Sequence, residues 1–196
     1  MYLLTNFMNQ KLTSKYIKNL KEILPLKKVY FHKDEITLQI DASDLLNVLT
    51  YLKYHNNCQY KSLSYIAGAD YPQKSNRFDV IYDLLSVRYN SRVRIKISLS
   101  QLDSVNSCEK IYPAANWFEC EVFDMFGIFF LNHSNLRRLL TDYGFEGYPL
   151  RKDFPLSGFV ELKYNDKKKR IVSEYLELAQ EYRTFDFLTP WNNSQS

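Results

Sequence analysis

Three carboxylates in the second half of the chain are its first candidates for chemistry. Glu119, Glu121 and Asp124 lie in a segment with the pattern of a helix. Glu121 and Asp124, three positions apart, would share one helical face, whereas Glu119 would lie elsewhere on the helix. Paired carboxylates can act as general acid and general base, although ion pairing is the commoner role of this pattern. The carboxylates alone therefore favour a structural role.

The arginine pair and the histidines form no complete reaction centre. Arg137 and Arg138 could clamp a phosphate or a carboxylate, but no glycine-rich loop follows a strand to build a nucleotide site. The histidines, His32, His55 and His133, have no cysteine or acidic partner at a spacing typical of metal ligands. We therefore expect His133 to form hydrogen bonds rather than to bind a metal. No Ser–His–Asp or Cys–His arrangement can be recognised.

The three cysteines, Cys58, Cys108 and Cys120, are widely spaced and include no C-x-x-C pair. Iron–sulfur clusters and structural zinc sites usually take closely spaced cysteines, so the sequence predicts neither kind of site within this chain. An odd number of cysteines without short spacings also argues against a disulfide scaffold. We expect three reduced thiols with structural roles.

The segment from Trp117 to Gly158 combines glycines, charges and aromatic side chains at unusual density. It holds four of the five glycines of the chain, which indicates a specified backbone path rather than a loose loop. A solvated loop would be poor in Phe and Tyr. We expect the segment to be buried with its charges paired. For Arg151, Lys152 and Asp153 we expect pairing at least partly out of water.

This segment resembles the 30-kDa subunit family of the respiratory NADH dehydrogenase, complex I. The family motif contains Glu-Arg-Glu, Asp-Met-Phe-Gly, a histidine and an Arg-Arg pair, and nearly every residue from Leu140 to Gly158 matches its final run. The departures are Cys120 in place of an arginine, Tyr148 in place of a histidine, and Ser134-Asn135 in place of Pro-Asp. The matching residues that the resemblance marks as candidates for the subunit interface are Glu119, Glu121, Asp124, His133, Arg137, Arg138, Asp142, Tyr143, Gly144, Phe145, Gly147, Arg151, Lys152 and Asp153.

The resemblance implies a function, partners and a location. Complex I passes electrons from NADH through iron–sulfur clusters to ubiquinone and couples this transfer to proton pumping. A chain of this family would be a cofactor-free subunit in the quinone-reducing part of the peripheral arm, beside the subunits that form the quinone pocket and hold the terminal cluster. FMN and the iron–sulfur clusters would lie in partner subunits. The complex would hold the chain at the matrix side of the mitochondrial inner membrane, and no nucleic acid partner is implied.

Two other classes of function have some support in the sequence. A nucleic-acid-binding module is suggested by Arg92, Arg94 and Lys96 on one face of a predicted strand, with tyrosines nearby and a pI near 8.8. A free-standing hydrolase could use the three carboxylates named above. Neither class explains the long match of the segment that ends at Gly158, so both rank below the subunit hypothesis.

Length and composition are typical of one domain followed by an extended tail. The chain has 196 residues, of which 45% are hydrophobic, and a formal net charge of +4. No apolar run approaches the ~18–20 residues needed to cross a bilayer, so the sequence predicts a soluble or peripheral protein. Periodic patterns end near Gly127, which predicts an α+β domain over residues 1–128 and an interaction tail over residues 129–196 that wraps partner subunits. A chain that ends near Leu131 should then fold alone.

Hydrophobic periodicity predicts helices packed on one side of a mainly antiparallel sheet. Pro25 should end the first helix, and Ser43 or Asp44 should cap the second. The predicted elements, in chain order, are a helix with Ile17 to Leu24, a hairpin of strands 27–32 and 35–40, a helix with Leu45 to Leu52, strands 62–69, 78–89 and 92–100, a helix from Ser104 that is interrupted at Pro113, and a helix over 114–126.

Regular structure is expected to be sparse after Phe129. Asn135 to Leu140 should form one or two helical turns, and the charge run from Asp166 to Arg170 should be a solvated turn. Residues 171–182 fit both a helical and a strand pattern, and the resemblance favours an extended conformation. The aromatic end from Phe185 to Trp191 would form an exposed apolar patch in water, so we expect a partner to cover it.

Overall fold

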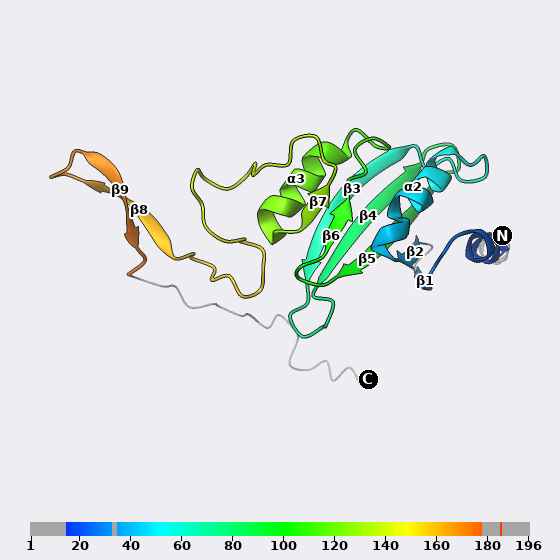
Figure 1. Ribbon diagram of the computed structural model, residues 1–196, viewed down its shortest axis with the longest axis horizontal. Helices are drawn as coiled ribbons and strands as arrows, with labels where there is room; N and C mark the ends of the chain where they lie inside the picture. Colours follow the sequence, from blue (N-terminus) through cyan, green and yellow to red (C-terminus); the bar gives the residue numbers. More distant parts are fainter. Residues whose placement is uncertain (1–14, 33–34, 178–184, 186–196) are drawn as a thin grey trace. The chain divides into compact units, whose positions relative to one another are not determined.

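The computed structural model of the chain describes residues 15–32, 35–177 and 185. The chain divides into two compact units, residues 1–152 and residues 153–196. The first unit contains a mixed sheet with its helices, and the second contains a separate hairpin (Figure 1).

Five strands form the main sheet, in the spatial order β1-β2-β5-β4-β3. All neighbours are antiparallel except β2 and β5, which are parallel, so the sheet is mixed but mainly antiparallel as the sequence predicts. Alternate side chains of each strand face the core because successive residues of a strand point to opposite faces. The strands are β1 (Lys28–His32), β2 (Glu35–Ile40), β3 (Ser62–Asp70), β4 (Phe78–Ser86) and β5 (Ser91–Leu99).

Helices α2 (Leu45–Tyr54) and α3 (Ala115–Phe126) lie on one face of this sheet (Figure 1). An N-terminal helix, described over residues 15–23, contributes Leu20 to the same apolar core. A short 3₁₀ turn (Ala42–Asp44) leads into α2, and Asp44 stands at the N-cap without a capping hydrogen bond from its side chain. The α+β class expected from the sequence is therefore confirmed.

The helix predicted from Ser104 is wrong, because this segment is a strand. Strand β6 (Ser104–Asn106) pairs in parallel with β7 (Phe129–Leu131), which follows α3. Val105 is buried in the core, so the pairing with a strand that comes later in the chain determines the local conformation. A serine before an apolar residue resembles a helix cap in sequence, and only this distant partner distinguishes the two structures.

The second unit contains an antiparallel hairpin of β8 (Val160–Asn165) and β9 (Arg170–Tyr175). Residues 166–169 form its turn and Arg170 begins β9, so the predicted solvated turn is confirmed. The extended conformation favoured for 171–182 is confirmed up to Tyr175, whereas residues 178–182 lie outside the described residues. The aromatic end also lies outside the described residues, apart from Phe185.

Candidate functional site

The three candidate carboxylates of α3 do not act together. Glu119 and Asp124 are both 0% exposed, whereas Glu121 is exposed on the solvent-facing side of the helix. The predicted pair of Glu121 and Asp124 on one face is therefore not formed. Each buried carboxylate instead contacts a different segment of the chain, and the two sets of contacts decide what this region can do chemically.

Glu119 fixes the segment that enters α3. Its Oε2 accepts a hydrogen bond from Ser107 Oγ at 2.5 Å, and its Oε1 accepts one from the Cys108 backbone N–H at 2.8 Å. Burial raises the pKa of Glu119, and these two hydrogen bonds offset the rise only in part. The contacts tie the helix to the loop between β6 and α3.

His133 forms hydrogen bonds, as the sequence predicts. Its Nδ1 accepts a hydrogen bond from the Asn135 backbone N–H at 3.0 Å, so the ring proton lies on Nε2 and is donated to the Asn116 carbonyl at 3.1 Å. The same Nε2 lies 3.8 Å from Glu119 Oε2 and 3.8 Å from Cys120 Sγ.

Cys120, His133 and Glu119 lie close together, and their residue types are those of a nucleophilic triad. No pattern in the sequence indicates this grouping. A triad needs the imidazole between nucleophile and acid, with one ring nitrogen for each. Here one nitrogen faces both groups, and Cys120 is buried. The arrangement is therefore a structural link between α3 and the segment after β7.

Asp124 organises the chain from residue 138 to residue 141. Its carboxylate accepts backbone N–H groups from Leu139 at 3.1 Å, Leu140 at 2.7 Å and Thr141 at 3.0 Å. The Thr141 hydroxyl donates a further hydrogen bond at 2.7 Å, and Arg138 Nη1 lies at 3.4 Å. Burial would raise the pKa of Asp124, but these donors outweigh it and lower the pKa.

These contacts also explain why the helical turns predicted for Asn135 to Leu140 are absent. In a helix, backbone N–H groups donate to carbonyls within the same segment. Here Leu139 and Leu140 donate to the Asp124 carboxylate of α3 instead. A buried charged acceptor outcompetes a short helix, which is unstable on its own.

Tyr148, which replaces a histidine of the family motif, lies between two arginines. The guanidinium of Arg138 is 4.9 Å from the ring centroid, and that of Arg151 is 4.4 Å from it. Arg138 Nη1 donates to the Gly147 carbonyl at 2.9 Å, and Arg151 Nε donates to the Phe126 carbonyl at 2.6 Å. These contacts fasten the loop to the end of α3.

Asp70, at the end of β3, also belongs to this network, although no motif marks it in the sequence. It receives both arms of Arg77, at 2.7 and 2.8 Å, and the backbone N–H of Lys152 at 2.8 Å. Hydrogen bonds from Arg77 lower the pKa of Asp70 more than burial raises it. Sequence reasoning misses this aspartate because its partners lie in a turn and in a distant segment.

The expected burial of the whole segment is correct only in part. Arg151 is half-buried and contacts a carbonyl and two aromatic rings, whereas the side chains of Lys152 and Asp153 are exposed. Tyr143 and Arg137 are also exposed. The remaining candidates form the turn after Thr141: Asp142 accepts the Tyr143 backbone N–H at 2.8 Å, Gly144 and Gly147 have positive φ, and Phe145 is half-buried.

The structure weakens the support for the two other classes of function, although Arg92 remains exposed. Arg94 lies 3.3 Å from Glu35 and 3.8 Å from Asp83, and Lys96 lies 2.8 Å from Asp79, so these cations are partly neutralised on their own sheet face. The buried carboxylates of α3 accept hydrogen bonds from within the chain and from different segments, so they do not form a shared acid–base site.

Two further observations concern metals and membranes. Among the described residues, no group of three or more His, Cys, Asp or Glu side chains could hold a metal ion. None of the helices in the described ranges is long and apolar enough to span a bilayer.

Comparison with known proteins identifies the family. Residues 38–160 match the family described as "Respiratory-chain NADH dehydrogenase, 30 Kd subunit". The chain belongs to this family. The resemblance found in the sequence is therefore confirmed, and the chain is part of NADH–quinone oxidoreductase, respiratory complex I.

Curated relatives and one solved structure agree with this assignment. The chain is 51% identical over 166 residues to NADH-ubiquinone oxidoreductase subunit 9 of Reclinomonas americana, covering 85% of this chain and 81% of the relative. It is 52% identical over 160 residues to an NADH-quinone oxidoreductase subunit of Methylorubrum populi, covering 82% and 73%. A chain from an archaeal membrane-bound sulfane sulfur reductase shares the fold, with a TM-score of 0.65, 22% identity and coverage of 87% and 99%.

Proposed function

We propose that this chain is a cofactor-free scaffold in the quinone-reducing part of the complex I peripheral arm. It supports electron transfer from NADH to ubiquinone, coupled to proton pumping, without taking part in the chemistry. Its partners are the subunits that form the quinone pocket and hold the terminal iron–sulfur cluster, and the FMN and the clusters lie in partner subunits. It lies on the matrix side of the mitochondrial inner membrane, attached through the complex; the relative from Reclinomonas americana supports an organellar location.

The buried charges of the first unit support a scaffolding role. Glu119, Asp124 and Asp70 are all used to fix the chain's own loops against α3 and the sheet. A catalytic acid or base must reach a substrate, and these groups are already occupied by internal donors. The unit is therefore built as a rigid support.

The observation that carries the proposal is the one-sided hairpin of the second unit. The register pairs Val160 with Tyr175 and Tyr164 with Ile171, and residues directly opposite each other share a face. Leu162 lies between them on this face, and the five side chains are between 52% and 84% exposed. Such an exposed apolar face on a two-stranded hairpin, which is marginally stable by itself, calls for a partner surface.

The opposite face of the hairpin is polar and supplies a matched control. It carries Glu161, Lys163 and Glu174, with Val172 opposite Lys163 as its one apolar residue in the hairpin register, and Lys163 Nζ lies 3.5 Å from Glu174. An exposed ion pair of this kind contributes little to stability. If the apolar face binds a partner and the polar face stays in water, a substitution on the apolar side of β8 should weaken assembly and one on the polar side should not.

The test compares Leu162→Asn with Lys163→Asn in the assembled complex. Loss of a buried leucine costs about 1.5–3 kcal/mol, so Leu162→Asn should weaken incorporation about 10–100-fold, and Lys163→Asn should leave it unchanged. Native gel separation of inner membranes, followed by mass spectrometry, measures incorporation. The proposal is wrong if both variants assemble like the unchanged chain, or if the chain is found only in a small soluble species.

A further inference from the structure

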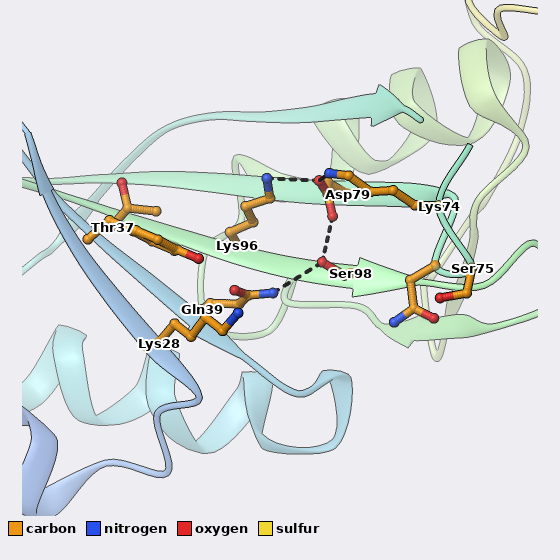
Figure 2. A pocket seen from close by; sticks show the side chains of 10 residues that line it. Lys28, Thr37, Gln39, Lys74, Ser75, Asp79, Lys96 and Ser98 are labelled. Atoms are coloured by element: carbon orange, nitrogen blue, oxygen red, sulfur yellow. Dashed lines mark hydrogen bonds and ion pairs between the residues drawn. The ribbon is translucent and has the colours of Figure 1, made fainter. Parts of the chain in front are cut away.

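A polar cavity of about 570 Å³ lies on the face of the sheet that no described helix covers (Figure 2). Strands β1, β2, β4 and β5 form its floor, and the loop between β3 and β4 forms one wall. Three lysines line it: Lys28 from β1, Lys96 from β5 and Lys74 from the loop. The family motif lies elsewhere in the chain, so this cavity is separate from the site described above.

A single buried carboxylate organises the lysines. Asp79 is 1% exposed, and its Oδ1 accepts a hydrogen bond from Ser98 Oγ at 2.6 Å. Lys96 Nζ lies 2.8 Å from Asp79 Oδ2, and Lys74 Nζ lies 3.9 Å from the same oxygen. Figure 2 shows these contacts as a continuous chain across β4 and β5. Asp79 thus holds the ammonium group of Lys96 at the floor of the cavity, whereas that of Lys74 lies farther away, on a side chain that is 54% exposed.

The cavity has an excess of positive charge. Three lysines face one aspartate, and within the described part of the chain no carboxylate pairs with Lys28. Lys28 and Lys74 are both exposed, so their ammonium groups can reach a ligand above the sheet. A site of this kind attracts carboxylates by charge complementarity, and the interaction weakens as salt rises.

The lining favours a protein partner over a small cofactor. Sites for small organic ligands are mostly apolar with few polar groups. Here ten residues line the cavity, and Tyr30 supplies the one aromatic ring among them. Tyr30 is 51% exposed at the edge strand β1, and exposed tyrosines are enriched where proteins bind each other.

We propose that this cavity receives an acidic segment of a neighbouring subunit, whose Asp or Glu side chains pair with Lys28 and Lys74. The proposal rests on the proposed function, because it requires the chain to be assembled in a complex. Lys96, already paired with Asp79, positions the site. The apolar hairpin and this cavity then make two contacts of different character, one driven by burial and one by charge.

Carbodiimide cross-linking of the intact complex tests the proposal, since this reagent joins a lysine amine to a carboxylate only where they touch. Mass spectrometry should find Lys28 or Lys74 joined to Asp or Glu residues of another subunit. The exposed contact between Lys27 and Asp41 within the chain is the positive control for the reagent. Lys61, an exposed lysine just before β3, is the control for random coupling.

Charge reversal provides the second arm. The double variant Lys28→Glu/Lys74→Glu should lower incorporation at least 10-fold, and Lys61→Glu should not. If the chain is in the complex but Lys28 and Lys74 couple to other subunits no more than Lys61 does, or if the double variant assembles normally, the proposal is wrong and the proposed function stands. If the unchanged chain is in no complex, the proposed function fails and this inference fails with it.

Discussion

The carboxylate of Asp70 accepts the backbone N–H of Lys152 at 2.8 Å, although 82 residues separate them in the sequence. Asp70 ends β3, at the edge of the sheet, and Lys152 ends the first compact unit. Because Arg77 also binds this carboxylate with both of its arms, the acceptor is held in place for the distant segment. One aspartate therefore joins the sheet to the end of the loop that follows α3.

This arrangement predicts that substitutions at Asp70 and at Lys152 lower the free energy of unfolding by very different amounts. Asp70→Ala should lower the free energy of unfolding by about 3–5 kcal/mol, because it leaves the charge of Arg77 without its buried partner. Lys152→Ala keeps the backbone N–H and removes only an exposed side chain, so its effect should stay within about 0.5 kcal/mol. Urea unfolding of the two variants measures both values. Equal stabilities would show that the Asp70 contacts contribute little.

The raised pKa of Glu119 predicts a pH dependence with a definite sign. A carboxyl whose pKa is higher in the folded state contributes stability below its unfolded value, near 4.5, and loses it as pH rises through the folded value. Glu119→Gln keeps the shape and removes this titration. The unfolding free energy of the unchanged chain relative to Glu119→Gln should therefore fall as pH rises from about 4 toward about 7. A difference that rises over this range would contradict the prediction.

Gly127 ends α3 in a left-handed conformation, with φ of 75°. A Cβ atom there would lie 2.6 Å from Arg151 Nη2 and 2.6 Å from the Tyr148 ring. Gly144, with φ of 70°, has no heavy atom within 4 Å of such a Cβ. Both glycine-to-alanine changes carry a backbone cost of roughly 1–2 kcal/mol. Gly127→Ala should cost more, by about 1–3 kcal/mol of crowding; thermal melting of the two variants measures the difference.

Elements with strong local periodicity could be predicted from the sequence. In β5 the apolar residues Val93, Ile95 and Ile97 alternate with polar ones, and the core packing follows this alternation. The helix α3 begins and ends close to its predicted bounds because Pro113 and Gly127 flank it. Such elements can be recognised locally, because one face is buried and apolar residues therefore recur at the period of the helix or strand.

The polar contacts of the site could not be predicted, because they join residues that no local pattern relates. Asp124 and Thr141 are 17 residues apart, and their contact replaces the helical turns expected near residue 138. Asp70 looks like an ordinary aspartate at the end of a strand, and its partner Lys152 lies within the family motif. The motif thus marks one partner of such a contact, and only the fold identifies the other.

The contacts of Arg151 give a different physical reason for its expected importance. The expected effect of substituting it is still a lower yield of assembled complex. Its guanidinium contacts the Phe126 carbonyl and the rings of Phe78 and Tyr148, and its charge also helps to lower the pKa of Asp70. Arg151→Ala removes a charged hydrogen bond and two ring contacts, a loss of about 1.5–3 kcal/mol. The yield of assembled complex should fall more than for Lys168→Ala in the exposed hairpin turn. Equal yields on a native gel would count against this role.

The independently folded unit should end later than periodicity predicts. Periodicity predicts a boundary at residue 128, but the described donors to the buried Asp124 lie between residues 138 and 141, and Asp70 is bound by Lys152. A chain that ends at Leu131 loses these donors, at about 1–3 kcal/mol each. Residues 1–152 should therefore melt cooperatively, residues 1–131 should be several kcal/mol less stable, and a protease should cut the full chain first after Lys152. Equal stability of the two truncated chains would instead support the boundary at residue 128.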